Sequence, residues 1–167
     1  IGISNPNKMT YAEVFLKTIN IDPHTASVKE LQKIAGENGW GDDSTDRHAL
    51  LDYIFSEAVI KNINSEQPFF IYDYPECMAS LATIKKGSPS VAERFELFIN
   101  GMEIANGFNE LCNVDEQKQR FDKEILIRKE KGMPELPLDS YFLNALESGL
   151  TKTAGVAVGI DRLLMVL

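Results

Sequence analysis

Apolar and polar residues alternate most clearly between residues 93 and 110, and this pattern predicts a β-hairpin. The apolar positions of its first strand are Phe95, Leu97 and Ile99, and the intervening positions hold Arg94, Glu96 and Phe98. Asn100-Gly101 follows, the dipeptide that best tolerates positive φ at both central positions of a type I′ turn. A second strand is therefore expected from Met102.

The register expected for this hairpin brings two carboxylates together. With a two-residue turn, the facing pairs are Ile99–Met102, Phe98–Glu103 and Glu96–Ala105. Glu96 and Glu103 then share one face as diagonal neighbours, about 7–8 Å apart at the backbone. Two long carboxylates at this separation can meet at one cation, although a solvated sheet face would also carry such a pair.

Capping boxes and apolar periodicity predict three helices in the first third of the chain, beginning near Thr10, Ser27 and Ser44. An aromatic strand is expected over 67–75, a charged helix over 115–128, a short helix over 139–149, and a buried strand followed by a helix over 153–162. Strands around a hairpin, with helices before, between and after them, indicate an α+β fold with a largely antiparallel sheet. We therefore divide the chain into a small helical subdomain, 1–66, and a core, 67–167.

Composition restricts the function classes. A net charge of -8 over 167 residues disfavours nucleic-acid binding, which needs clustered Lys and Arg. Cys77 and Cys112 lack metal-ligand spacing, so a reduced cytoplasmic setting is expected. No apolar run is long enough to cross a membrane, and no membrane role is expected. The chain begins at Ile1 without methionine and ends at Leu167 within an apolar run, which indicates a fragment of a larger protein.

Several stretches resemble a known family. Gly155-Val-Ala-Val-Gly-Ile-Asp-Arg162 resembles motif 3 of class II aminoacyl-tRNA synthetases, and Arg94-Phe-Glu-Leu-Phe98 with Glu103-Ile-Ala-Asn-Gly-Phe-Asn-Glu110 resembles the paired active-site strands of lysyl-tRNA synthetases. Thr10-Tyr-Ala-Glu-Val-Phe-Leu, Ile21-Asp-Pro23, Asp46-Arg47, Tyr74-Pro75 and Ala79-Ser-Leu-Ala82 resemble the elongation factor P–lysine ligases, which are lysyl-tRNA synthetase paralogues without the anticodon-binding domain. The resemblance covers nearly the whole chain. It implies part of a class II aminoacyl-tRNA synthetase-like antiparallel sheet flanked by helices.

The resemblance also implies a reaction. A lysine-type amino acid would be activated with ATP to an aminoacyl-adenylate and then joined to a lysine side chain of elongation factor P. The substrate would be lysine or, by preference, (R)-β-lysine, and the cofactors would be ATP and Mg²⁺. The full-length enzyme would be a homodimer that uses no tRNA.

Roles for individual residues follow from the same resemblance. On the nucleotide side, Glu96 and Glu103 would hold Mg²⁺–ATP, Leu97, Ile104 and Gly159 would line the ATP site by backbone approach, and Arg162 would stack on or pair with the nucleotide. Glu103 and Arg162 would be the catalytic residues, because Mg²⁺ and arginine offset the repulsion between a carboxylate and the α-phosphate. On the amino acid side, Glu110 would bind the substrate ammonium, and Asn106, Phe108 and Ala157 would shape its pocket. Phe108 could also be an ordinary core residue.

These roles require an irregularity in the alternation of side chains along the second strand of the hairpin. Regular alternation places Asn106, Phe108 and Glu110 on the face opposite Glu103. The assignment therefore requires a bulge or bend, which we expect at Gly107.

The chain also differs from common bacterial lysyl-tRNA synthetases. Ala105 and Ala157 stand where those enzymes usually have glycine, and both alanines fit the ligase branch. Motifs 1 and 2, which supply the dimer interface and the principal phosphate-binding arginine, have no counterpart here and would lie before Ile1. We therefore expect the isolated chain to be inactive.

Two other hypotheses remain open. The chain could be part of a truncated lysyl-tRNA synthetase that charges tRNA, or a non-catalytic interaction module derived from a synthetase. The set Glu96, Glu103, Glu110 and Arg162 argues against a module that has lost catalysis. Binding of tRNA or of elongation factor P by the full-length protein would distinguish a lysyl-tRNA synthetase from an elongation factor P–lysine ligase.

Overall fold

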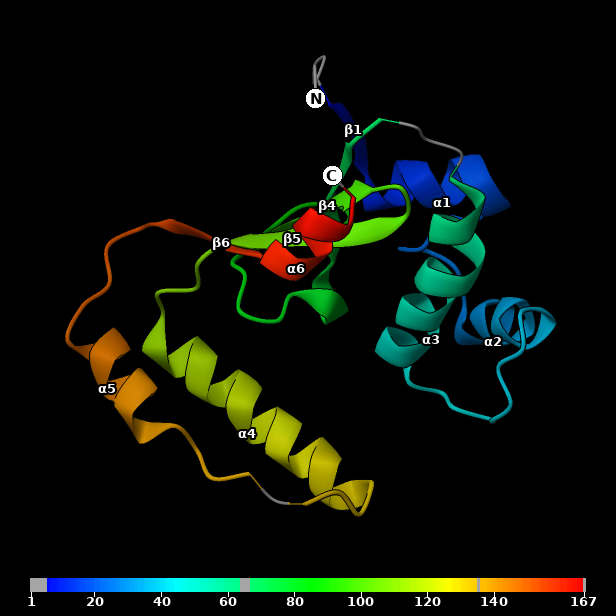
Figure 1. Cartoon of the computed structure of the whole chain (residues 1–167). Helices are drawn as coiled ribbons and strands as arrows, with labels where there is room; N and C mark the ends of the chain where they lie inside the picture. Colours follow the sequence, from blue (N-terminus) through cyan, green and yellow to red (C-terminus); the bar gives the residue numbers. More distant parts are fainter. Residues whose placement is uncertain (1–5, 64–66, 135, 167) are drawn as a thin grey trace.

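The computed structural model describes residues 6–63, 67–134 and 136–166. Its strands are β1 (Asn7–Thr10), β2 (Phe69–Pro75), β3 (Ile84–Lys85), β4 (Val91–Ile99), β5 (Met102–Asn109) and β6 (Ala154–Val158). Its α-helices are α1 (Tyr11–Ile19), α2 (Val28–Glu37), α3 (Arg47–Ile54), α4 (Val114–Glu130), α5 (Ser140–Glu147) and α6 (Ile160–Met165). The strands form one sheet in the order β1-β2-β4-β5-β6, with β3 beside β4. Figure 1 labels β1, β4, β5 and β6 of this sheet and helices α1 to α6. β1 is parallel to β2 and the other pairs are antiparallel, so the predicted α+β class is confirmed.

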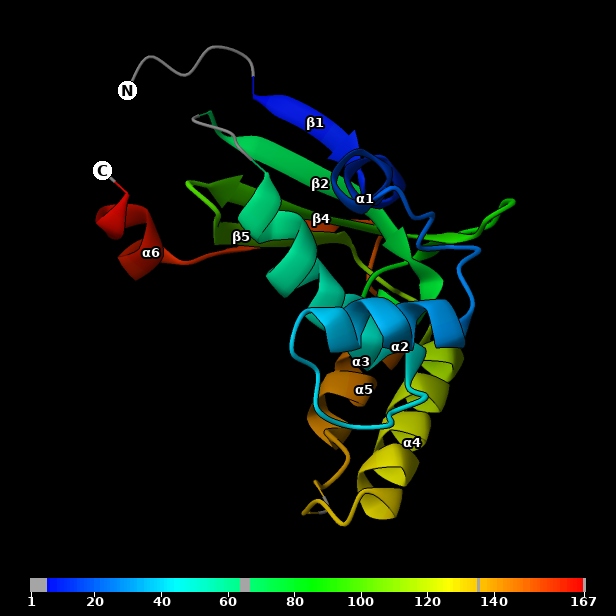
Figure 2. The ribbon, with the colours of Figure 1, turned by 90° about the vertical axis from the view of Figure 1, so that its right-hand side faces the viewer.

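Helices α1 to α3 lie on one side of the sheet, and an aromatic core joins them to it (Figure 2). The Tyr11 ring lies 4.9 Å from that of Phe55, and the Phe55 ring lies 5.8 Å from that of Phe98 on β4. Residues from both segments of our division thus share this core, and β1, which the sequence pattern did not predict, pairs with β2. The division at residue 66 stays a prediction.

The three expected helix starts are confirmed. Thr10 and Ser27 form capping boxes with Glu13 and Glu30, and Asp46 caps α3 by accepting from the next helical N–H groups. In each case the side chain satisfies backbone donors that have no partner inside the helix.

Replacing Asp46 by alanine should lower the free energy of unfolding by about 1 kcal/mol, the usual cost of losing such a cap. Partial burial raises the pKa of Asp46. Hydrogen bonds from Lys131 and from the N–H groups of Ala49 and His48 outweigh this effect and bring the pKa below its ordinary value of 3.8. A carboxyl group whose pKa is lower in the folded chain than in the unfolded chain stabilises the folded state at pH values above the unfolded-state pKa. This stabilisation is lost as the pH falls through the folded-state pKa. Urea unfolding at neutral and acidic pH measures both effects. Asp46→Asn, which keeps the cap without the charge, is the matched control.

Strand β6 does not match the prediction of a buried strand. It lies at the end of the sheet order, and Val156 and Val158 are 58% and 45% exposed. Helix α6, which follows it, is also largely exposed. An apolar run alone does not show whether a strand is buried on both faces. In the part of the chain that the structure describes, both faces of β6 are largely exposed.

Helices α4 and α5 extend away from the sheet in both ribbon views (Figures 1 and 2). Arg120 attaches α4 to the rest of the chain, because its Nη1 donates to the carbonyl oxygens of Ser80 and Ala82 at 2.8 Å each. Its other terminal nitrogen pairs with Glu116 at 2.5 Å. This arginine therefore has a structural role: it joins α4 to the segment that precedes β3.

Candidate functional site

The hairpin of β4 and β5 has the predicted turn, and a bulge determines which side chains share its faces. Asn100 and Gly101 both have positive φ, 51° and 74°, as a type I′ turn requires. Phe98 pairs with Glu103 as expected, but Glu96 pairs with Asn106 rather than with Ala105. The predicted Glu96–Ala105 pair is wrong because the register shifts by one residue just after the turn.

The extra residue is Ile104, so the bulge predicted at Gly107 is misplaced. The pairs Leu97–Ala105 and Phe98–Glu103 are one residue apart along β4 but two residues apart along β5. This bulge brings Asn106 to the face that Glu103 already occupies. Gly107 keeps the regular register, and a Cβ there would lie 2.4 Å from the Phe95 ring. Close packing of that ring explains the glycine.

A second irregularity brings Tyr74 to the same face. Phe69 and Ile71 face the core, so strict alternation along β2 would turn Tyr74 away from it. The register with β4 shifts between residues 72 and 74, and Asp73 there has a φ of 54°. Tyr74 is consequently buried, with its ring 4.8 Å from that of Tyr11.

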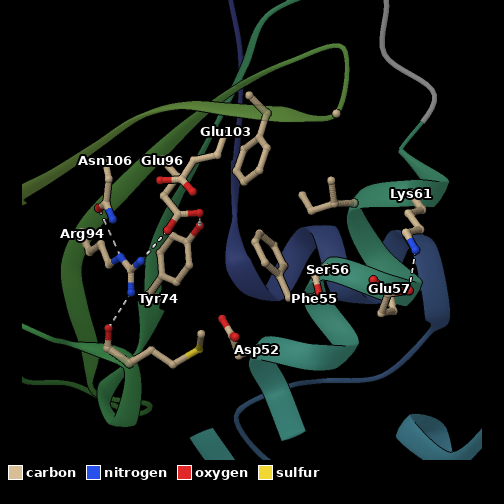
Figure 3. Close-up of a pocket in the computed structure, with 14 residues that line it drawn as sticks. Asp52, Phe55, Ser56, Glu57, Lys61, Tyr74, Arg94, Glu96, Glu103 and Asn106 are labelled. Atoms are coloured by element: carbon tan, nitrogen blue, oxygen red, sulfur yellow. Dashed lines mark hydrogen bonds and ion pairs between the residues drawn. The ribbon is translucent and has the colours of Figure 1, made fainter. Parts of the chain in front are cut away.

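These side chains form one wall of a cavity of about 450 Å³ (Figure 3). The opposite wall is helical: α3 continues into a π-helical turn, Phe55–Val59, and a 3₁₀ turn, Ile60–Asn62. The sheet contributes Tyr74, Arg94, Glu96, Phe98, Gly101, Glu103 and Asn106, and the helical wall contributes Asp52, Phe55, Ser56, Glu57, Ile60 and Lys61, with Met78 completing the lining. Such π-helical turns occur frequently at functional sites.

Glu96 lies in the sheet wall and has two partners. The Tyr74 hydroxyl donates to Glu96 Oε2 at 2.6 Å, and Arg94 Nη2 pairs with Glu96 Oε1. Burial raises the pKa of Glu96, while Arg94 and the Tyr74 hydroxyl act to lower it and Glu103 raises it further. Burial and the neighbouring Glu96 charge raise the pKa of Tyr74 well above its ordinary value, so this hydroxyl remains a donor.

Glu103 is more accessible and lies beside Arg162. Its side chain is 36% exposed, and Arg162 Nη1 lies 3.4 Å from its Oε2 and 3.0 Å from its backbone oxygen. The N–H of Gly159 donates to the Ile104 carbonyl at 2.8 Å, which joins the start of α6 to the bulge. A Cβ on Gly159 would touch the Arg162 side chain at 3.5 Å. The structure thus brings together Glu103, Ile104, Gly159 and Arg162 of the predicted nucleotide site.

Leu97 is the member of the predicted nucleotide set that lies apart. It pairs with Ala105 on one side and with Phe70 on the other. Because it alternates with Glu96, its side chain points to the second face of the sheet, away from the cavity. Its predicted role through the backbone stays a prediction.

The residues predicted to bind the amino acid substrate lie farther along β5, just after it, and on β6. Asn106 lines the cavity, and Phe108 lies at the edge of the core with Arg94 5.8 Å from its ring centroid. Ala157 pairs with Asn106 across β5 and β6 and is exposed. A Cβ on Gly155 would lie 2.1 Å from Glu110 Oε1, so the Glu110 side chain lies against that glycine. Phe108, Glu110 and Ala157 do not line the cavity itself.

The sequence pattern missed Tyr74 and the whole helical wall. The sequence places Tyr74 in an aromatic strand and in a stretch that resembles the ligases, but predicts no role for it in the site, because its orientation depends on the irregularity at Asp73. Asp52, Ser56 and Lys61 lie on one helical run, where polar residues at helical spacing are typical of a solvated face. Neither set has a local signal that would reveal a cavity.

The donor atoms suit a hard divalent cation that is also bound by phosphate. Glu96 and Glu103 lie on adjacent strands of one wall, and carboxylate oxygens are the protein ligands that Mg²⁺ prefers. No group of three or more histidine, cysteine or carboxylate side chains in the described residues is arranged to hold a metal ion by itself. Such a cation would therefore take further ligands from water or a phosphate group.

Comparison with known proteins gives a consistent result. Residues 4–167 match the family model described as tRNA synthetases class II (D, K and N). The chain is 41% identical over 168 residues to the elongation factor P–(R)-β-lysine ligase of Pseudoalteromonas translucida, covering 99% of this chain and 52% of that protein. The proteins of the same name from Histophilus somni (strain 2336) and Vibrio vulnificus are 43% and 42% identical, with 93% and 95% of this chain and 49% and 50% of theirs covered.

The chain therefore spans about half the length of the curated relatives that it matches. Among the described residues, no helix has both the length and the apolar character needed to cross a lipid bilayer.

Proposed function

The chain belongs to the family of class II tRNA synthetases (D, K and N), and from this premise we propose that it is part of an elongation factor P–lysine ligase. The complete protein, meaning the complete gene product that contains this chain, would activate (R)-β-lysine or lysine with ATP. It would then transfer the aminoacyl group to a lysine side chain of elongation factor P. The identity of about 42% to ligases of that name, over nearly the whole chain, carries this proposal.

The cavity suits the first step, in which the amino acid carboxylate attacks the α-phosphate of ATP. Two anions must approach each other, so positive charge is needed at the site. Arg162 would supply it from the protein, since its side chain is 54% exposed beside Glu103. Glu96 and Glu103 would hold Mg²⁺, which, when bound, offsets the charge of the phosphates.

The amino acid substrate would lie on the same face of the sheet, toward the part where β5 pairs with β6. Glu110 provides a carboxylate for the substrate ammonium, and Asn106 lies between it and the nucleotide side. The side chain of Phe108, partly buried, provides an apolar surface for the methylene chain. These roles together require a substrate that carries an amine at a distance from its carboxylate.

Elongation factor P is favoured over tRNA as the acceptor. The relatives' name identifies the factor, and the net charge of -8 is unfavourable for binding tRNA phosphates. A homodimer of the complete protein belongs to the same proposal.

ATP–pyrophosphate exchange by the complete protein tests the proposal. We expect exchange that depends on (R)-β-lysine, or more weakly on lysine, and on Mg²⁺. Exchange with neither amino acid would favour the non-catalytic alternative. Exchange with lysine followed by charging of tRNA would favour a lysyl-tRNA synthetase.

Replacing Ala157 by glycine should relax the preference for (R)-β-lysine over lysine. Ala157 faces Asn106 across the strands, and its methyl group would narrow the pocket floor against which the two isomers lie differently. One methylene-sized change in a pocket is worth about 1–3 kcal/mol. The ratio of kcat/KM for the two isomers in adenylate formation measures this change. An unaltered ratio in a folded variant would move the selectivity elsewhere. Ala105, the other alanine that fits the ligase branch, pairs with Leu97 and so points to the second face of the sheet, away from the cavity.

A further inference from the structure

We propose that Arg94 is a positioning residue that fixes the side-chain amide of Asn106, and through it the amino acid side of the site, without contacting the substrate itself. The proposal rests on the ligase function proposed above, because it names a residue on which the amino acid site of that enzyme depends.

The guanidinium of Arg94 is directed inward. Its Nη1 donates to the Met78 carbonyl at 3.0 Å, its Nη2 pairs with Glu96, and its Nε donates to Asn106 Oδ1 at 3.3 Å. The side chain is only 15% exposed. Its central carbon lies 4.7 Å from the Tyr74 ring centroid, so one face of the guanidinium stacks on that ring.

Arg162 provides the contrast within the same site. It is 54% exposed, and its hydrogen bonds within the described residues run from one terminal nitrogen to the backbone and side chain of Glu103. Arg162 can therefore turn toward a ligand, whereas Arg94 can reach one only by leaving three partners. The two arginines have different tasks: one faces the ligand and the other holds the protein groups around it.

The contact with Arg94 determines which end of the Asn106 amide faces the cavity. Arginine has only donors, so the atom of Asn106 that faces it must be the oxygen, however similar the two ends of an amide look. The NH₂ group of Asn106 is then left to donate, and Asn106 lines the cavity. A ligand oxygen, such as that of an amino acid carboxylate, is the group that such a donor recognises.

Arg94 also connects the two halves of the site. On one side it balances the buried charge of Glu96, and on the other its guanidinium carbon lies 5.8 Å from the Phe108 ring centroid. Arg94 and Phe108 face each other across β4 and β5, and Glu96 and Asn106 form the next pair on the same face. The bulge at Ile104 is what aligns these four side chains on one face.

The test replaces Arg94 by lysine and by methionine in the complete protein. Lysine keeps a positive charge beside the buried Glu96, so this variant remains informative if the methionine variant fails to fold. Its single ammonium cannot serve Glu96, the Met78 carbonyl and Asn106 together. For Arg94→Lys we expect the KM for the amino acid in pyrophosphate exchange to rise roughly tenfold, the lower end of the effect seen when a group that orients a metal ligand is removed. In this variant the KM for ATP should change by less than about threefold, because lysine still balances the charge of Glu96. Arg94→Met, which also removes that charge, should raise the KM for the amino acid at least as much.

Arg120→Met is the matched control. Arg120 is also a partly buried arginine that donates to two carbonyls and pairs with one carboxylate, but it lies on α4 outside the cavity. We expect its variant to leave both KM values unchanged. A general loss of packing would instead affect the Arg94 and Arg120 variants alike.

Two measurements distinguish positioning from a merely structural role. In a double-mutant cycle, Arg94→Lys should add little to the amino acid KM of Asn106→Ala, because its effect passes through that amide. The side-chain amide NMR signals of Asn106, assigned by their loss in Asn106→Ala, should shift in Arg94→Lys and stay in place in Arg120→Met. Additive effects in the cycle, equal changes in both KM values, or an unshifted Asn106 amide would overturn the proposal. Absence of exchange by the wild type would count against the ligase function alone, since the NMR comparison still tests the Arg94–Asn106 contact.

Discussion

Replacing Glu103 by glutamine in the complete protein should slow adenylate formation by about 10²–10³-fold, the usual effect of removing one electrostatic stabiliser of a transition state. Glutamine keeps the shape of the side chain but not its charge. The variant would lose the pairing with Arg162 at 3.4 Å and a carboxylate ligand for Mg²⁺. The rate of ATP–pyrophosphate exchange at saturating ATP and amino acid measures the loss.

Glu76→Gln is the control for this prediction. Glu76 is a carboxylate that forms an ion pair with Lys86 at 3.6 Å, and it does not line the cavity. We expect its variant to exchange pyrophosphate at the wild-type rate. A Glu103 variant that stays within about threefold of wild type would remove this residue from the catalytic set.

Changes at Glu110 should instead act on the amino acid. Glu110→Gln should raise the KM for the amino acid tens-fold with little change in that for ATP, because a charge-assisted hydrogen bond to an ammonium is worth about 1.5–3 kcal/mol. Gly155→Ala should have a similar effect without touching the carboxylate chemically. Its Cβ would lie 2.1 Å from Glu110 Oε1, so the carboxylate has to move.

Gly36→Ala tests whether the effect comes from Glu110 or from any added methyl group. Gly36 lies in α2, and a Cβ there meets nothing within 4 Å. This variant should leave both KM values unaltered. If Gly155→Ala and Glu110→Gln changed the two KM values equally, Glu110 would not belong to the amine site.

The features predicted correctly from the sequence are those that local chemistry determines. The turn at Asn100-Gly101 follows from the tolerance of both residues for positive φ, and the starts of α1, α2 and α3 follow from side chains that bond the next backbone N–H groups. Each depends on residues within four positions of each other. The pairing of Phe98 with Glu103 also followed directly from the length of the turn.

The features predicted wrongly or missed depend on contacts between distant segments. A single extra residue, Ile104, moved Asn106 to the cavity face, and regular alternation gives no sign of it. The bulge was expected at Gly107, but that glycine serves the Phe95 ring instead. Tyr74 became part of the site through the irregularity of β2 at Asp73, and the helical wall at Asp52 through the packing of α3 over the sheet.

A competition between the two acceptors tests the proposed function. The complete protein is given ATP, Mg²⁺ and (R)-β-lysine together with equal amounts of elongation factor P and tRNA, and both acceptors are analysed by mass spectrometry. We predict that elongation factor P gains one aminoacyl group on a lysine side chain while the tRNA stays uncharged. Charging of the tRNA with elongation factor P unmodified would contradict the proposed function, and so would the absence of any product.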